Sequence, residues 1–268
     1  MSTGWRNLRW LLAYWISVFG FRCGRFLPTR LCYAVSVPIA DFCFLLLSRH
    51  RRNLVRNLER VVGETEARAA ARRVFRNFAK YVIDFYQIPS RGREELERRI
   101  DFRDWENLDR VLDESNGTIF VTLHLGQVEL GGAALSTYSH PIHVITEALE
   151  SPRMDGFIQG LRRKLGMKTI SSKKAKLGIV RSLNRGEVLA MMLDAVPPGE
   201  GICVDLFGAP ALVSGAPARI ALRTGARVLP AVVSRAEYDP TKLVPEIDFD
   251  LDFDLDFEPT GDEEADVR

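Results

Sequence analysis

Cysteine is scarce in this chain of 268 residues, and none of its four cysteines belongs to a CxxC pair. Cys23, Cys32 and Cys43 lie in apolar N-terminal segments, and Cys203 stands alone. This spacing indicates neither a disulfide framework nor a structural zinc site, so we expect buried free thiols. Such thiols fit a reducing, cytoplasm-facing compartment.

The chain also lacks the residue groups that several enzyme classes need. His140 and His143 are close in sequence, but no third protein ligand for a catalytic zinc accompanies them, so we interpret them as loop or strand-edge histidines. Ser214 and Ser234 have no nucleophile-elbow context, which argues against a serine hydrolase. We therefore expect an enzyme site without a metal.

Acidic residues are nearly absent from the start of the chain. Residues 1–62 contain ten arginines but only Asp41 and Glu59 as acids, whereas residues 237–268 contain thirteen acids against Lys242 and Arg268. This asymmetry favours a membrane surface at the N-terminus. Nucleic acid is a weaker interpretation, because no binding motif accompanies the arginines and the apolar segments between them would be unexplained.

No apolar run reaches the roughly 20 residues that a transmembrane span needs. Residues 10–21 are apolar and aromatic, with flanking arginines and no small-residue cleavage site, which is typical of an interfacial helix. Residues 31–47 are interrupted by Pro38 and Asp41, so we expect a membrane-apposed or buried helix there. The alternative is an ordinary helical layer with solvated arginines.

Hydrophobic periodicity predicts helices first and then alternating strands and helices. Residues 51–88 are expected to be helical with a break at Gly63, and residues 93–115 form a second, polar helical region. The expected strands are 117–123, 142–146, 168–171, 187–193, 202–207 and 227–233, and the expected helices between them are 126–135, 152–165, 173–184 and 214–223. This alternation predicts an α/β fold in which a mixed central sheet is wrapped by helices.

The C-terminal region has an unusual pattern. Residues 247–257 alternate strictly between apolar side chains and aspartates, which predicts a strand with one apolar and one acidic face. Carboxylates on one flat face do not converge around an ion, so we favour a last strand with a solvated outer face over a cation site.

His124 is the main candidate for chemistry. It directly follows the predicted strand 117–123, and ligands meet α/β sheets at the carboxyl ends of strands. Gly126 permits a sharp turn and a close approach of the backbone to a substrate, and Glu129 lies in the first turn of the next helix. We expect the Glu129 carboxylate to fold back onto one imidazole nitrogen of His124, which leaves the other as a general base. By spacing alone, a structural polar pair at the start of the helix fits better than a catalytic pair.

Several segments of this chain match blocks of one known family. They are the H-x4-D/E (HX4E) block at 124–129, the arginine-rich lead-in at 51–58, the Arg-x3-Gly segment at 162–166, Asp194 with the V-x-F-F-G-like block at 204–208, and the helix–strand ending at 215–230. In these blocks the chain resembles the bacterial lipid A biosynthesis (lauroyl/myristoyl) acyltransferase family, which includes phosphatidylinositol mannoside acyltransferase-like proteins. The resemblance covers roughly residues 5–235.

The resemblance implies a glycerolipid acyltransferase-like fold with N-terminal membrane-associated helices. Residues 1–62 would form the membrane-associating region, residues 63–258 the acyltransferase domain, and residues 259–268 an acidic tail. The family usually continues to a Trp- and Arg-rich helix, so truncation or divergence of the tail stays open.

The resemblance also implies acyl transfer from an acyl thioester to a lipid hydroxyl, without a cofactor or a covalent enzyme intermediate. His124 would be the general base oriented by Glu129, and Arg162, Asp194 and Gly126 would bind substrate or support the site. Lys173, Lys174 and Lys176 would receive an acidic acyl carrier protein or coenzyme A phosphates, or simply form a solvated helix face. The expected location is the cytoplasmic face of the bacterial inner membrane.

Two questions stay open at this point. A lipid A precursor, a mannosylated phosphatidylinositol and a lysophospholipid are all compatible acceptors. The alternative from another functional class is a non-catalytic peripheral membrane or lipid-binding protein with the same fold.

Overall fold

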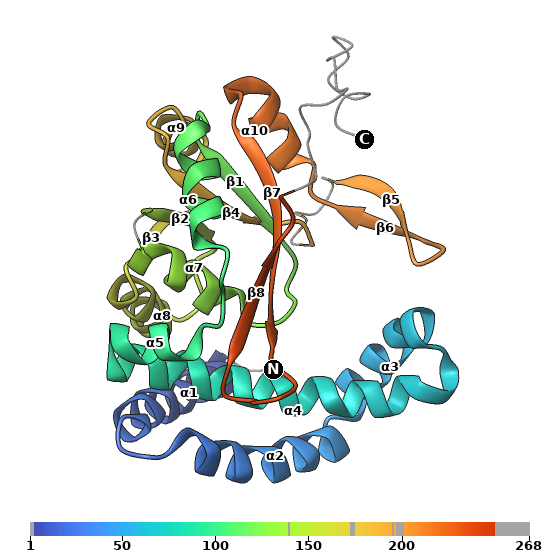
Figure 1. Cartoon of the computed structure of the whole chain (residues 1–268). Helices are drawn as coiled ribbons and strands as arrows, with labels where there is room; N and C mark the ends of the chain where they lie inside the picture. The colour runs from blue at the N-terminus through green and yellow to red at the C-terminus, as the bar shows by residue number, and fades with distance from the viewer. Residues whose placement is uncertain (1–2, 139, 172–174, 195, 197–200, 250–268) are drawn as a thin grey trace. The chain divides into compact units, whose positions relative to one another are not determined.

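The structure is a computed structural model that describes residues 3–138, 140–171, 175–194, 196 and 201–249 (Figure 1). The chain divides into two compact units. The larger unit comprises Met1–Tyr14, Gly92–Val204 and Leu212–Arg268, and the smaller unit comprises Trp15–Arg91 and Asp205–Ala211.

The larger unit is built on a six-stranded sheet with the order β3-β2-β4-β1-β7-β8. Its strands are β1 (Thr118–Thr122), β2 (Ile142–Thr146), β3 (Lys168–Ser171), β4 (Val188–Met192), β7 (Arg227–Arg235) and β8 (Leu243–Ile247). All neighbouring strands are parallel except β8, which runs antiparallel to β7. The prediction of a mixed central sheet in an α/β fold is therefore confirmed.

Helices surround this sheet. They are α5 (Arg93–Arg99), α6 (Trp105–Glu114), α7 (Val128–Tyr138), α8 (Pro152–Lys164), α9 (Ala175–Leu183) and α10 (Ala216–Thr224). The central strand β1 is buried along almost its whole length, and Ile119 and Val121 pack with Ile179 and Leu183 of α9. A strand covered on both faces reads as a continuous apolar run, which is the pattern that predicted β1.

The smaller unit is helical, apart from a hairpin tip. It contains the second half of α1 (Thr3–Gly24), α2 (Thr29–Leu46), α3 (Ser48–Val62) and α4 (Glu64–Arg91), with the tip of the hairpin formed by β5 (Ile202–Leu206) and β6 (Ala209–Val213). Both α2 and α3 pack against α4. The break at Gly63, where φ is +81°, is confirmed.

Two helix boundaries differ from the expectation. The helix α4 continues through Pro89 to Arg91 instead of ending there. A proline removes one backbone hydrogen bond from a helix. Pro89 lies in the last turn of α4, so few residues of the helix follow the missing bond. The expected helical region 93–115 is two helices, α5 and α6.

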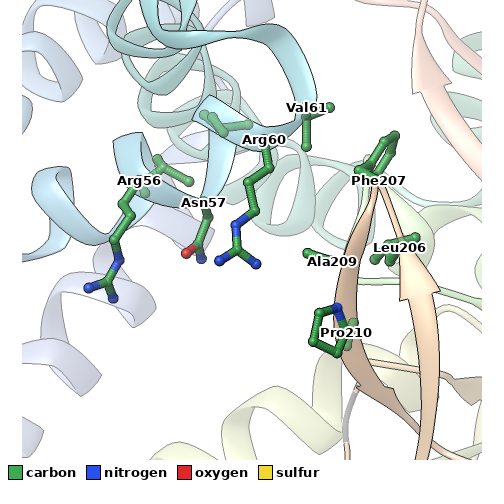
Figure 2. A pocket seen from close by; sticks show the side chains of 11 residues that line it. Arg56, Asn57, Arg60, Val61, Leu206, Phe207, Ala209 and Pro210 are labelled. Carbon is green, nitrogen blue, oxygen red and sulfur yellow. The ribbon is translucent and has the colours of Figure 1, made fainter.

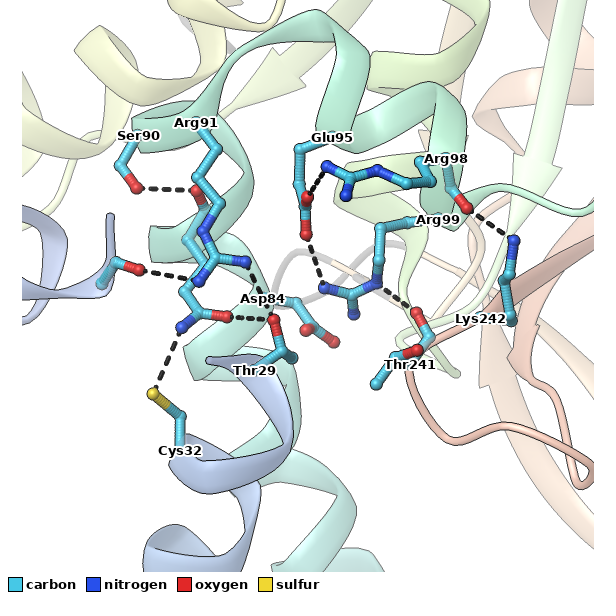
Figure 3. Close-up of polar contacts among 12 residues, drawn as sticks. Thr29, Cys32, Asp84, Ser90, Arg91, Glu95, Arg98, Arg99, Thr241 and Lys242 are labelled. Carbon is cyan, nitrogen blue, oxygen red and sulfur yellow. Dashed lines mark hydrogen bonds and ion pairs between the residues drawn. The ribbon is translucent and has the colours of Figure 1, made fainter. Parts of the chain in front are cut away.

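The turn between α1 and α2 is held by side chains from the end of α4 (Figure 3). Arg91 donates from Nη1 to Oγ1 of Thr29 at 3.0 Å, and from Nη2 to the carbonyls of Gly24, at 3.1 Å, and Leu27. Nε2 of Gln87 donates to the same Leu27 carbonyl at 3.0 Å. These bonds satisfy carbonyl groups that the end of α1 leaves without intrahelical donors.

The helix α2 combines an apolar sequence with an ion pair. Among the described residues it is the one helix long and apolar enough to cross a membrane, and 22% of that window is buried. Its Asp41 accepts two hydrogen bonds each from Arg72 and Arg76 of α4. The hydrogen bonds from Arg76 and Arg72 hold the pKa of Asp41 well below its ordinary value. Asp41 therefore fastens α2 to α4.

Two further expectations concern the C-terminal strand and the four cysteines. The predicted strand 247–257 falls mostly outside the described residues, which end at residue 249. All four cysteines are free thiols, but Cys203 is exposed and the other three are half-buried, so the expectation of full burial was wrong.

Candidate active site

His124 and Asp194 follow two neighbouring parallel strands. The register of β1 and β4 pairs Thr122 with Met192, and the amide of Leu193 donates to the Thr122 carbonyl at 2.8 Å. His124 and Asp194 each lie two positions beyond that last pair. The strand register therefore brings them together at the carboxyl edge of the sheet, where α/β proteins bind ligands.

The imidazole of His124 is held by the Asp194 carboxylate. Its Nδ1 lies 2.9 Å from Oδ1 of Asp194, and the His124 backbone amide donates to Oδ2 at 3.0 Å and to Oδ1 at 3.2 Å. The His124 side chain is 64% exposed, and its Nε2 forms no hydrogen bond to any described residue. With Nδ1–H donating to the carboxylate, Nε2 is the nitrogen that can accept a proton from a substrate.

The Glu129 carboxylate forms no hydrogen bond to the His124 imidazole, although the sequence predicted one. Glu129 lies in the first turn of α7, and its carboxylate accepts hydrogen bonds from Arg162 in the last turn of α8. Nε of Arg162 lies 3.1 Å from Oε1 and 3.0 Å from Oε2, and Nη2 also donates to Oε1. The expected His124–Glu129 contact is thus replaced by two separate pairs. A guanidinium that donates several hydrogen bonds is a stronger partner for a carboxylate than a neutral imidazole is.

The Glu129–Arg162 pair is largely shielded from water. The side chains are 14% and 17% exposed, and Nη1 of Arg162 lies 3.5 Å from Oε1 of Gln159. Because the guanidinium is already engaged by these oxygens, the pair fits a supporting role that links α7 to α8. This geometry favours support of the site over direct capture of a phosphate by Arg162.

Gly126 lies against the strand β7. Its φ is +70°, it forms a bridge with Val233, and the next amide, of Gln127, donates to the Val233 carbonyl at 2.8 Å. A Cβ on Gly126 would lie 2.0 Å from that carbonyl oxygen. The glycine is therefore required by the close approach of its loop to β7, which fixes the segment that follows His124.

The other polar candidates lie elsewhere. Nε2 of His140 lies 3.3 Å from Oδ1 of Asp109, and Nε2 of His143 lies 2.8 Å from Oε2 of Glu187. The two histidines have different partners, and the part of the chain that the structure describes holds no group of three His, Cys, Asp or Glu side chains arranged for a metal ion. Lys173 and Lys174 lie outside the described residues, as does the side chain of Lys176.

The profile of the family described as bacterial lipid A biosynthesis acyltransferase matches residues 2–264. This chain belongs to that family. The resemblance found in the sequence is therefore confirmed.

Curated relatives of this lipid A biosynthesis acyltransferase family member carry the name phosphatidylinositol mannoside acyltransferase. The protein from Mycolicibacterium smegmatis is 24% identical over 184 residues, which cover 66% of this chain and 60% of the relative. The protein from Mycobacterium tuberculosis (strain CDC 1551 / Oshkosh) is 23% identical over 186 residues, which cover 66% of this chain and 59% of the relative. The chain thus spans about three fifths of the length of these relatives.

Proposed function

We propose that this protein is an acyltransferase that moves a fatty acyl group from an acyl thioester to a hydroxyl of a membrane glycolipid or lysophospholipid. Family membership supports the reaction class. The observation that carries the proposal is the His124 imidazole, held by Asp194 at Nδ1 and open at Nε2, at the carboxyl edge of the sheet. The donor is acyl carrier protein or coenzyme A.

His124 acts as the general base in this proposal. Its Nε2 takes the proton of the lipid hydroxyl while the oxygen attacks the thioester carbonyl carbon. A carbon–oxygen bond forms, and the carbon–sulfur bond then breaks. The thiolate that leaves receives the proton from the imidazolium, so His124 returns to its neutral form.

Asp194 orients His124 and stabilises the imidazolium that forms during the transfer. The carboxylate of a Ser-His-Asp triad has the same task towards its histidine. Glu129 and Arg162 support the site by tying α7 to α8, which contributes to keeping the loop after His124 in place. This division of roles replaces the earlier expectation that Glu129 orients His124.

A direct test is acyl transfer by the variant His124→Ala. Purified protein is given a radiolabelled acyl thioester and extracted membrane lipids, and the acylated products are identified by mass spectrometry. We expect the rate to fall by at least about 10²-fold, because general base catalysis contributes that much. The matched control is His140→Ala, which removes a histidine outside the site. Unchanged transfer by His124→Ala would favour the non-catalytic lipid-binding alternative.

We further propose that the smaller unit binds the cytoplasmic face of the inner membrane. Large apolar side chains are exposed along its helices, namely Trp15, Ile16 and Phe19 of α1 and Leu31, Val35, Ile39, Phe42, Leu45 and Leu46 of α2. Exposed apolar surface of this extent is typical of a membrane or partner interface. The adjoining arginines of α3 favour a membrane with anionic lipids.

The membrane proposal is tested with Ile39→Ser/Phe42→Ser, whose side chains are 57% and 61% exposed. We expect a lower fraction of the protein to float with vesicles in a density gradient, with little change in folding. The control Leu149→Ser/Val180→Ser removes two apolar side chains of the larger unit that are each 39% exposed. Equal flotation of both variants and the unchanged protein would overturn the proposal.

A further inference from the structure

The tip of the β5–β6 hairpin and one side of α3 line an open groove of about 630 Å³ (Figure 2). All of its lining residues belong to the smaller unit. The lining is mainly apolar, with Leu58 and Val61 from α3 and Phe207 and Pro210 from the hairpin. None of these residues belongs to the His124 site.

The hairpin turn presents an aromatic side chain to solvent. Phe207 has φ +55° and Gly208 has φ +71°, as in the tight two-residue turns of β-hairpins. Oδ1 of Asp205 accepts a hydrogen bond from the Gly208 amide at 3.0 Å, so the Asp205 carboxylate is hydrogen-bonded within the turn. Phe207 is 63% exposed. A positive φ is uncommon for such a bulky residue, and here it accompanies an exposed ring beside the groove.

The other side of the groove is cationic. Arg56, Asn57 and Arg60 leave α3 on one side, and all three line the groove together with Ala209 and Pro210 of the hairpin (Figure 2). Within the described residues, neither arginine forms a hydrogen bond or an ion pair. Like charges four positions apart on a helix repel each other, so a bound anion would relieve this repulsion.

We propose that this groove binds one anionic glycerophospholipid of the membrane, with its phosphate between Arg56 and Arg60 and an acyl chain along Leu58 and Phe207. The proposal rests on the membrane association proposed above and does not depend on the chemistry of His124. It adds a specific lipid contact to a surface that would otherwise act only through its overall charge and apolarity.

The combination of groups decides the class of ligand. Guanidinium groups bind phosphate oxygens with several hydrogen bonds, and the phosphate of a soluble anion would accept these bonds as well as that of a lipid. A soluble anion would leave Val61 and Phe207 exposed to water. A phospholipid covers the apolar lining and neutralises the arginines at the same time.

The experiment is native mass spectrometry of the full chain in a non-ionic detergent, with equimolar phosphatidylglycerol and phosphatidylcholine. We expect one bound phosphatidylglycerol in excess over phosphatidylcholine. The variant Arg56→Gln/Arg60→Gln should lower that excess about tenfold, the change that a loss of about 1.4 kcal/mol produces. Phe207→Ser tests the apolar side and should lower the bound phosphatidylglycerol severalfold.

The matched control is Arg49→Gln/Arg52→Gln, which removes the same charge from exposed arginines of the same helix that do not line the groove. It should keep the excess within about twofold. An equal loss in both arginine variants would mean diffuse surface charge and would overturn the proposal. Displacement of the lipid by glycerol phosphate at the same concentration would also overturn it, in favour of a soluble phosphate site.

His124→Ala separates this proposal from the proposed function. It should abolish acyl transfer and retain the bound phosphatidylglycerol. If the unchanged protein transfers no acyl group but still binds the lipid in the groove, the proposed function fails and the lipid site stands.

Discussion

Nδ1 of His124 lies 2.9 Å from Oδ1 of Asp194, although the two residues are 70 positions apart in the chain. They meet because β1 and β4 are neighbours and both side chains lie two positions beyond the last paired residues. The carboxylate that contacts the imidazole thus comes from a neighbouring strand and not from the helix that follows His124. The sheet register, more than the His–x4–Glu spacing, sets the geometry of this site.

Asp194→Asn should therefore reduce acyl transfer more than any change at Glu129. The amide keeps the size of the side chain but removes the charge that stabilises an imidazolium, so we expect kcat to fall by about 10²-fold or more with KM nearly unchanged. Asp194→Glu should restore part of the rate, and its pH profile should resemble that of the unchanged protein. The control is Asp113→Asn, on the exposed surface of α6. If Glu129→Gln lowers kcat more than Asp194→Asn, the assignment of Asp194 is wrong.

Glu129 and Arg162 should behave as a coupled structural pair. Glu129→Gln and Arg162→Met should each lower the free energy of unfolding by about 1–3 kcal/mol, because each leaves a largely buried partner without its counter-charge. The double variant should lose less than the sum of the single losses. Urea unfolding of all four proteins measures this coupling. Strictly additive losses would show that the ion pair contributes nothing of its own.

The local apolar pattern was sufficient to predict the strand β1 and the position of His124 at its end. Asp194 was named as a candidate, but its contact with His124 depends on strand order and register, which local periodicity does not specify. The acid expected at the imidazole was instead the nearest one in sequence, Glu129. The bidentate bond from Arg162 to Glu129 depends on the packing of α7 and α8, which sequence spacing also does not specify.

Two strands, β6 and β8, were missed and each contains a proline, whereas Pro230 did not prevent the prediction of β7. The strand β6 contains Pro210 and β8 contains Pro245, and proline within a run argues against a strand unless it lies at a sheet edge. Both are edge strands in the structure, because β5 and β6 form a two-stranded sheet and β8 ends the large one. Edge position is a property of the assembled sheet, so the sequence could not supply it.

Gly126→Ala should destabilise the loop after His124. The added Cβ would lie 2.0 Å from the Val233 carbonyl oxygen at a backbone φ of +70°, so we expect a loss of about 2–4 kcal/mol in the free energy of unfolding and a large loss of transfer. Gly156→Ala is the control, since no atom lies within 4 Å of its added Cβ and it sits in α8. Alanine there should stabilise the helix by up to about 1 kcal/mol. Equal stability of the two variants in urea unfolding would contradict the close approach to β7.

Arg91→Ala should loosen the turn between α1 and α2. The substitution removes the donors to Thr29 and to the carbonyls of Gly24 and Leu27. We expect trypsin to cleave after Arg25 severalfold faster, because cleavage requires local opening of the turn. The control Arg93→Ala removes an exposed arginine that pairs only with Glu97 among the described residues. Similar cleavage rates in the two variants would contradict the role assigned to Arg91.

His143 should make the stability of the larger unit sensitive to acid. The histidine is buried beside Glu187, which Lys168 and Arg185 also contact. Burial lowers the pKa of His143 below its ordinary value of 6.5, against the opposing effect of the Glu187 charge. For Glu187, burial alone would raise the pKa, but hydrogen bonds from Arg185 and Ser182 and the nearby positive charges outweigh it and lower the pKa to about 2.

These directions separate two pH windows. Because the folded pKa of His143 is depressed, the unfolded chain binds the proton more readily, and the free energy of unfolding should fall as the pH drops below about 6.5, by at most about 1.4 kcal/mol per pH unit. The contribution of Glu187 is lost only as the pH falls from about 4.5 toward 2. His143→Gln should therefore flatten the stability profile between pH 7 and pH 5. Urea midpoints at several pH values measure this, with His50→Gln on the exposed surface of α3 as the control. A profile for His143→Gln that stays as steep as that of the unchanged protein would assign the acid sensitivity to other groups.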